Sequence, residues 1–567
     1  MSTAPEHALA AAQGVLDDTW ATYSRSPFIA RDLSGTLSVL PDIGLEEATR
    51  KAREGQEIQR HIAGLDIDLL PSDVAVTVAA ARTLADRWAR EEDWHWLASD
   101  PLGVGFYGMF APTAYSGGFV LNTIHETLDQ VVIDGPDDAD RHLSLIGDYA
   151  RLIRQLTERT KGQAERGIYL PAPQLGKSVQ LVRGLKEVAG RTLRAAPERS
   201  SHPVGEHVER RITTEVEPAF DELLHLLDDP AYAERAPEQV GISQYPGGEE
   251  IYAELVRVHT TLDLTVEQVH DRGHTRMARI HEEMRDLMSS AGFAGSPQDY
   301  LASLHDDPRW RASTPDEIAA HFQRYIDRLA PEIDQHFGVQ PDSPYGVAAL
   351  PEAVSGSMTF GYYSVPQVDR NVGLYMFNAV NLAQTALPMI AALNYHELVP
   401  GHHFHMASQR EAQDLHPLRK HSFINAFNEG WAEYAARFAG EIGMYREPEE
   451  RFGRLVMEAF LTTRLVVDTG MNALGWDLQR ARDYMNEHSF MSPVEVDSET
   501  LRYSCDLPGQ ALAYKLGDDF LFDLREDLRA ALGESFRVSD FHDAVFRSAG
   551  LPLPLVAENV RAELLPR

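Results

Sequence analysis

The feature that most constrains the fold of this chain is helical periodicity, which extends over most of its 567 residues. Apolar residues recur every three to four positions in four stretches with few helix breakers. Each such helix must bury its apolar face against a neighbour, so the sequence predicts a mainly α fold. The four stretches are residues 74–96, 147–159, 204–227 and 251–288.

One segment departs from this pattern. Residues 344–378 are rich in Val, Tyr, Phe, Gly and Pro, which is typical of short strands joined by turns. We expect a small β-sheet there, followed by more helices. Residues 1–240 are predicted to form a helical N-terminal region that covers a cleft, and residues 241–567 to form the catalytic region.

Composition excludes several classes of function. The formal net charge of -34 argues against a nucleic-acid partner, because phosphate backbones would be repelled. A lone cysteine, Cys505, excludes an intrachain disulfide and a cysteine-based zinc site. The N-terminus lacks the features of a signal peptide, and no apolar run approaches the roughly 18 residues of a membrane span. We therefore expect a cytoplasmic protein without a membrane partner, whose oligomeric state the sequence does not indicate.

Histidines gather in residues 394–409, which read NYHELVPGHHFHMASQ. A zinc-binding helix of the His-Glu-x-x-His type presents two imidazoles one turn apart, and the glutamate beside the first histidine activates water. His396 and Glu397 match the start of this pattern. Because zinc lowers the pKa of a bound water towards about 7, Glu397 is predicted to be the general base that collects its proton.

The second histidine does not follow at the usual spacing. Pro400 and Gly401 stand before His402 and His403. On a straight helix His402 would lie about 9 Å along the axis from His396, on the wrong side for a shared metal. Proline and glycine are typical of a kinked or bulged helix. We expect a local distortion that brings His402 to the metal, with His403 as the alternative ligand.

A third ligand is expected from residues 427–434, FNEGWAEY, where Glu429 and Glu433 are one helical turn apart. We predict that Glu429 completes the site and that Glu433 is solvated or supports a ligand. Three protein ligands leave a position open for water, as a catalytic zinc requires. Nitrogen and carboxylate ligands without thiolate favour one zinc ion, although manganese and iron stay open.

Several segments in order resemble the bacterial family called domain of unknown function 885, a divergent gluzincin-like zinc peptidase group. The Pro-Gly insertion between the histidines is typical of that family. The chain differs from many relatives at Asn472, where they often carry histidine, and in lacking the signal of exported lipoproteins. The matching segments are 244–273, 361–369, 396–403, 428–436, 465–476 and 502–517.

The resemblance implies a large helical zincin-like metallopeptidase fold with a small β-sheet next to the active-site helix. Arg502 and Tyr503 resemble the Arg-Tyr pair of angiotensin-converting-enzyme-like gluzincins, so Tyr503 is predicted to stabilise the oxyanion, although a core aromatic role is as consistent. Arg502, Tyr514 and Lys515 are candidates for binding a substrate carboxylate, with structural ion pairing as the alternative.

These residues predict a zinc-dependent hydrolase that cleaves short peptides or peptide-like amides. The alternative is a metal-dependent hydrolase or lyase that acts on a small amide metabolite in a biosynthetic pathway. An inert binding protein on the same scaffold is disfavoured, because His396, Glu397 and Glu429 are all present.

Overall fold

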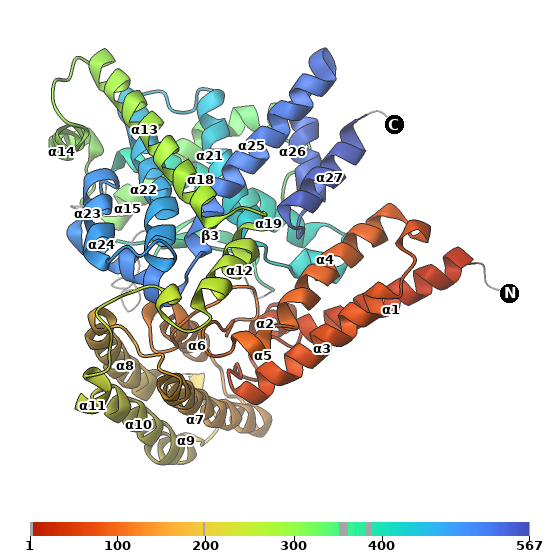
Figure 1. The fold of residues 1–567 in the computed structure, drawn as a ribbon, viewed down its shortest axis with the longest axis vertical. Coiled ribbons are helices and arrows are strands. Elements are labelled where there is room, and N and C mark those ends of the chain that lie inside the picture. Colours follow the sequence, from red (N-terminus) through yellow and green to blue (C-terminus); the bar gives the residue numbers. More distant parts are fainter. Residues whose placement is uncertain are drawn as a thin grey trace. The chain divides into compact units, whose positions relative to one another are not determined.

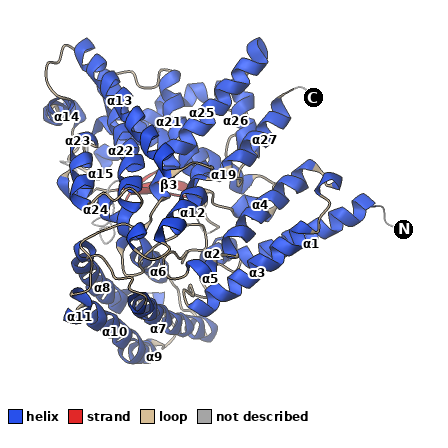
Figure 2. Ribbon diagram, viewed as in Figure 1, coloured by secondary structure: helices blue, strands red, loops and turns tan. Residues whose placement is uncertain are grey.

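Helices dominate the computed structural model, which describes residues 4–194, 196, 199–350, 361–368, 370–379 and 387–565 (Figures 1 and 2). The prediction of a mainly helical fold with a small sheet is confirmed. The backbone forms two compact units, and two short later segments return to the first. The first unit comprises Met1–Leu255, Met471–Leu478 and Glu499–Pro508, and the second comprises Val256–Gly470, Gln479–Ser498 and Gly509–Arg567.

The first unit is built on amphipathic helices that bury one face each. In α7, Ile146, Tyr149 and Ile153 are fully buried, and the helix extends the predicted stretch 147–159 at both ends. Pro136 occupies its first turn, where a missing N–H costs nothing. The helices are α1 Ala4–Tyr23, α2 Pro27–Ser34, α3 Leu45–Ala63, α4 Ser72–Trp88, α5 Glu91–Trp94, α6 Phe119–Leu128, α7 Pro136–Glu165, α8 Ala172–Thr192, α9 Gly205–Arg211, α10 Glu217–Leu227, α11 Pro230–Ala233 and α12 Gly248–Thr260, which crosses into the second unit.

The second unit contains the remaining long helices and the sheet. None of the helices in the described part of the chain combines the length and the apolar character needed to cross a membrane. The helices are α13 Val266–Ser290, α14 Pro297–Asp306, α15 Pro315–Leu329, α16 Ile333–His336, α18 Ile390–Glu397, α19 His402–Glu411, α20 Pro417–His421, α21 Asn425–Glu441, α22 Pro448–Asn472, α23 Leu478–His488, α24 Pro493–Leu501, α25 Ala513–Leu532, α26 Val538–Arg547 and α27 Leu553–Leu564.

The sheet has three strands in the order β1-β3-β2, drawn in red in Figure 2. The central strand β3, Gly373–Phe377, pairs parallel with β1, Tyr345–Ala349, and antiparallel with β2, Gly361–Ser364. Alternate residues of β3 are buried, and the Phe377 ring stacks on Phe322 of α15 with ring centroids 6.1 Å apart. The sheet is thereby fixed to the helical body on one side.

Two predicted helical stretches are broken in the structure. Residues 251–288 form two helices, because α12 ends at Thr260 and α13 begins at Val266. The Thr265 hydroxyl accepts from the Gln268 N–H while the Gln268 side chain accepts from the Thr265 N–H. This capping box satisfies backbone donors that a continuous helix would satisfy internally, so it starts a new helix. The stretch 74–96 is likewise divided, into α4 and the short α5.

Two glycines allow α21 and α25 to approach closely. A Cβ atom at Gly430 would lie 2.5 Å from the Cα atom of Gly517, and one at Gly517 would lie 2.3 Å from the Ala426 carbonyl oxygen. No side chain fits between the two backbones at this crossing. The close contact sets the separation of α21, which carries Glu429 and Glu433, from α25, which carries Tyr514 and Lys515.

We predict that Gly517→Ala lowers the free energy of unfolding by roughly 1–3 kcal/mol, because the added methyl group forces the two helices apart. Gly14→Ala is the matched control, since a Cβ atom there meets nothing within 4 Å. The Gly14→Ala change within α1 should leave the free energy of unfolding unchanged or raise it by roughly 0.5–1 kcal/mol. Chemical denaturation of the full-length chain measures both, and equal stability of the two variants would contradict the proposed contact.

Candidate metal centre

The histidine segment forms two helices separated by a four-residue turn. α18 ends at Glu397 and α19 begins at His402. Between them Leu398 (φ -110°, ψ -95°) and Gly401 (φ -79°, ψ -127°) leave helical geometry. The predicted distortion is therefore present, as a complete break and not a bulge within one helix.

Two contacts define this turn. The Trp431 indole N–H donates to the Pro400 carbonyl oxygen at 2.9 Å. A Cβ atom at Gly401 would lie 1.8 Å from the carbonyl oxygen of His396, so only glycine permits the turn to fold back on the end of α18. The Pro-Gly pair thus has a direct structural role.

The turn brings three predicted ligands together. Glu429 Oε2 lies 3.7 Å from His396 Nε2 and 3.4 Å from His402 Nε2. One ligand atom from each of the three residues lies within 4.8 Å of the others. The ligand-bearing side chains come from three helices: α18, α19 and α21.

The local chemistry fits a divalent ion. Glu429 Oε2 is buried and faces the ring nitrogens of His402 and His396. Burial acts to raise the pKa of the Glu429 carboxyl, but His402, His396 and a hydrogen bond from Tyr514 hold this pKa below its ordinary value. An ionised carboxylate between two imidazole nitrogens is a donor set suited to zinc. His396, His402 and Glu429 would hold the ion.

The structure separates His402 from His403, which the sequence left open. The Tyr363 hydroxyl is 2.8 Å from His403 Nδ1, and the Ser343 carbonyl oxygen is 3.1 Å from His403 Nε2. Both ring nitrogens of His403 are therefore engaged with protein groups. His402 directs Nε2 toward Glu429, and its Nδ1 lies 3.4 Å from His405 Nε2.

A carboxylate contacts the Nδ1 atom of His396, the ring nitrogen that does not face Glu429. Its Nδ1 lies 2.9 Å from Oε1 of Glu433, which is fully buried. A hydrogen bond from Nδ1–H to a carboxylate fixes the tautomer and leaves Nε2 available for an ion. Burial alone would lower the pKa of His396, but Glu433 raises it above its ordinary value.

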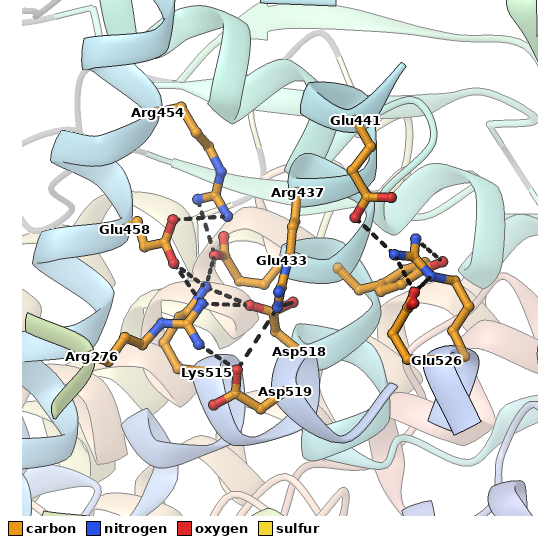
Figure 3. A network of polar contacts seen from close by, with 12 residues as sticks. Arg276, Glu433, Arg437, Glu441, Arg454, Glu458, Lys515, Asp518, Asp519 and Glu526 are labelled. Carbon is orange, nitrogen blue, oxygen red and sulfur yellow. Dashed lines mark hydrogen bonds and ion pairs between the residues drawn. The ribbon is translucent and has the colours of Figure 1, made fainter. Parts of the chain in front are cut away.

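Glu433 belongs to a buried ion network (Figure 3). Its second carboxylate oxygen lies 2.9 Å from Lys515 Nζ and 3.3 Å from Arg454 Nη1. Lys515 is also 2.7 Å from Asp518, which is 2.9 Å from Arg276. Burial acts to raise the pKa of Glu433, but Lys515 and Arg454 hold it well below its ordinary value. Because Lys515 is fully buried among carboxylates, its position favours structural ion pairing over substrate binding.

The predicted base lies at the end of the first ligand helix. Glu397 is the last residue of α18 and is 8% exposed. Burial raises the pKa of its carboxyl above the ordinary value, although His396 and His402 act to lower it. A raised pKa brings a carboxylate closer to the range in which it accepts a proton efficiently near neutral pH.

The three remaining predicted residues lie in two places. The Tyr514 ring stacks on His396 with centroids 6.1 Å apart, beside the candidate metal centre. Tyr503 and Arg502 belong to the first unit. There the Tyr503 hydroxyl is buried and donates to Glu499, and the Arg502 guanidinium lies 4.7 Å from the centroid of the Tyr115 ring. Their roles toward substrate stay predictions.

Comparison with known proteins identifies the family. Residues 27–560 match the model of the family described as "Bacterial protein of unknown function (DUF885)". The chain belongs to this family.

Two solved structures share the fold of this family member. A putative lipoprotein from Colwellia psychrerythraea has a TM-score of 0.82 at 23% identity, with 98% of each chain covered. A putative lipoprotein of unknown function from Shewanella oneidensis has a TM-score of 0.70 at 16% identity, covering 98% of this chain and 99% of that one. No curated protein matches the chain. For this DUF885 chain a cytoplasmic location stays a prediction.

The sequence left open whether Glu433 is solvated or supports a ligand, and it gave no sign of the contact between His402 and His405. Arg454 and Glu458 of the ion network are one turn apart on α22, among several other charged residues of that helix. Arg276 is more than 150 residues from either, so no local pattern connects them.

We predict that His402→Ala loses tight metal binding while His403→Ala retains it. His402 offers a ring nitrogen to the site, whereas both nitrogens of His403 contact other groups. The loss in His402→Ala should exceed the roughly 10- to 100-fold typical of losing a ligand's hydrogen-bond partner. Metal affinity, measured for both variants by competition with a chelating dye, decides whether His402 or His403 is the ligand. Loss of the ion in His403→Ala alone would assign the ligand to His403.

We predict that Glu433→Gln weakens metal binding by roughly 10- to 100-fold and lowers the free energy of unfolding by roughly 3–5 kcal/mol, because Lys515 and Arg454 lose a buried counter-charge. Glu441→Gln is the control, since Glu441 is ion-paired on the same helix but with Arg525. Dye competition and chemical denaturation give the two readouts. Unchanged metal affinity in Glu433→Gln would exclude the supporting role.

Proposed function

We propose that the protein is a zinc-dependent hydrolase that cleaves short peptides or peptide-like amides. The observation that carries the proposal is the convergence of His396, His402 and Glu429 to within 4.8 Å of one another. Glu397, at the end of α18, supplies a buried carboxylate on the same helix as the first ligand.

The chemistry follows from these residues. When bound, a zinc ion would polarise the scissile carbonyl and lower the pKa of a water molecule. Glu397 takes the proton of the attacking water on its carboxylate and passes it to the leaving amine nitrogen. Glu433 keeps the Nδ1 proton of His396 in place throughout, because its own pKa is depressed and it stays ionised.

The finer assignment to a gluzincin-like, zincin-type group is also part of the proposal. It is supported by the order of the residues: a His-Glu pair, a second histidine beyond a turn, and a glutamate on a later helix. In a strict zincin helix the two histidines share one helix. Here the break at Leu398–Gly401 takes the place of the regular spacing.

The substrate class rests on the polar residues near the end of the chain. From the sequence, Tyr503 is a candidate for stabilising the oxyanion, and Arg502 and Tyr514 are each candidates for binding a substrate carboxylate. Tyr514 has the strongest support, because it hydrogen-bonds Glu429 and stacks on His396. A short substrate with a free C-terminus is the class that a hydroxyl or guanidinium donor of this kind would bind.

A library of dipeptides and tripeptides, incubated with the zinc-loaded protein and read by mass spectrometry, tests the proposal. Each free peptide is paired with its C-terminally amidated form. We expect cleavage that stops on chelation and is weaker for amidated peptides, because a charge-assisted contact is lost. No cleavage of any member by protein with verified zinc content would contradict the peptidase proposal.

We predict that Glu397→Gln retains the ion and loses turnover by roughly 10²- to 10⁴-fold, because the amide keeps the shape of the side chain but accepts no proton. Metal content and single-substrate kinetics are measured on the same preparation. Activity near the wild-type level, with the ion present, would place the base elsewhere.

Tyr503→Phe is predicted to lower kcat by about 100-fold with little change in KM, because an oxyanion donor acts mainly in the transition state. The hydroxyl also donates to Glu499, so unfolding is followed in parallel to exclude a loss of structure. An unchanged kcat would leave Tyr503 a residue of the core.

A further inference from the structure

A second group of histidines lies outside the candidate metal centre. His270 and His274 are one turn apart on α13 and share one face of the helix. Their Nε2 atoms lie 3.2 Å from each other, and their ring centroids are 4.8 Å apart. Neither residue is close in sequence to the candidate ligands His396, His402 and Glu429.

A hydrogen bond orients the first of these rings. His270 Nδ1 lies 2.8 Å from the Thr469 hydroxyl oxygen. That hydroxyl donates its own hydrogen to the carbonyl oxygen of Leu465, at 2.6 Å, so it accepts from His270. The proton of His270 therefore resides on Nδ1, and its Nε2 lone pair accepts a hydrogen bond from Nε2–H of His274. An ion can take the place of this hydrogen when His274 carries its proton on Nδ1 instead. This is the tautomer that a metal-binding imidazole requires.

The second ring completes a chelating geometry. Two imidazole nitrogens at about 2.0–2.1 Å from one ion lie about 3 Å apart when the angle at the ion is near that of a tetrahedron or octahedron. The observed separation of 3.2 Å matches this value. His274 is exposed, so water can reach the position between the rings and fill the remaining coordination sites.

The surrounding charges are mixed. Asp271 acts to raise the pKa of both histidines, which reflects a field that attracts cations, while Arg480 acts in the opposite direction. Burial, the largest influence, lowers the pKa of each ring below its ordinary value. Both imidazoles are therefore mostly neutral at neutral pH and can donate lone pairs.

We propose that His270 and His274 form a second metal site, which binds a transition-metal cation such as Ni²⁺, Cu²⁺ or Zn²⁺ through two imidazoles and water. Imidazole ligands suit these ions, whereas Mg²⁺ and Ca²⁺ prefer oxygen. Two protein ligands bind more weakly than the three of the candidate metal centre. The site is independent of the proposed hydrolase activity.

Because His270 is hydrogen-bonded to Thr469 of α22, an ion at this site also reinforces the contact between α13 and α22. An ion that binds only the folded chain stabilises it in proportion to the logarithm of ion concentration over Kd. Added Ni²⁺ should therefore raise the thermal unfolding temperature, and substitution of His274 should remove this effect.

Calorimetric titration of full-length protein with Ni²⁺ tests the site, in a His402→Ala background that removes a ligand of the other centre. We expect about one equivalent of Ni²⁺ to bind in this background and to be lost when His274→Ala is added. His207→Ala is the control, because His207 is an exposed histidine with no histidine one turn away on its helix. No Ni²⁺ binding in the background variant, or equal binding with and without His274, would overturn the proposal.

Two further measurements avoid dependence on the background variant. In the otherwise wild-type chain, His274→Ala should lower Ni²⁺ stoichiometry by about one equivalent and leave the tighter site unchanged. Electron paramagnetic resonance of bound Cu²⁺ in the His402→Ala background should show coupling to two imidazole nitrogens. Coupling to one nitrogen or none would contradict the paired site.

Discussion

Glu433 connects the candidate metal centre to the interior of the second unit. One carboxylate oxygen contacts His396 Nδ1, and the other contacts Lys515 and Arg454. The position of the first ligand therefore depends on charges contributed by α21, α22 and α25. The Gly430–Gly517 contact brings α21 and α25 close enough for Lys515 to reach Glu433.

A network of this kind is costly to desolvate, and its components hold one another in their charged forms. Arg276, Arg454 and Lys515 face Glu433, Glu458 and Asp518 within the buried interior (Figure 3). Replacing such a network by apolar residues is often neutral for stability, whereas removing one member leaves an unpaired buried charge. Stability alone does not explain its presence. We propose that the network orients His396, because a ligand with a fixed tautomer binds an ion more tightly than a freely rotating one.

The sequence predicted the site to a useful extent because its chemistry is local. Spacing selected His396 and Glu429, which the structure brings together, and the Pro-Gly pair indicated a distortion. The role of Glu397 as the base stays a prediction. The choice between His402 and His403 depended on backbone geometry at Leu398 and Gly401, which spacing does not specify. For Lys515 the sequence left substrate binding and structural ion pairing open, and its contacts with Glu433 and Asp518 favour ion pairing.

The fold, like the site, could be predicted from the sequence only where local patterns determine it. Apolar periodicity predicted the helices, but the break between α12 and α13 follows from one capping box at Thr265. The sheet was located correctly, but its strand order could not be inferred. β3 pairs directly with β1, although β2 lies between them in the sequence. Pairings between residues hundreds of positions apart, such as Arg276 with Asp518, leave no trace in one sequence. The placement of segments 471–478 and 499–508 in the first unit is of this kind.

X-ray absorption at the zinc edge, on protein loaded with one equivalent of zinc, tests the central claim most directly. The account predicts nitrogen and oxygen ligands at about 2.0–2.1 Å, outer-shell scattering from two imidazoles, and no sulfur. A shell of oxygen alone, or one without imidazole scattering, would contradict a centre formed by His396, His402 and Glu429.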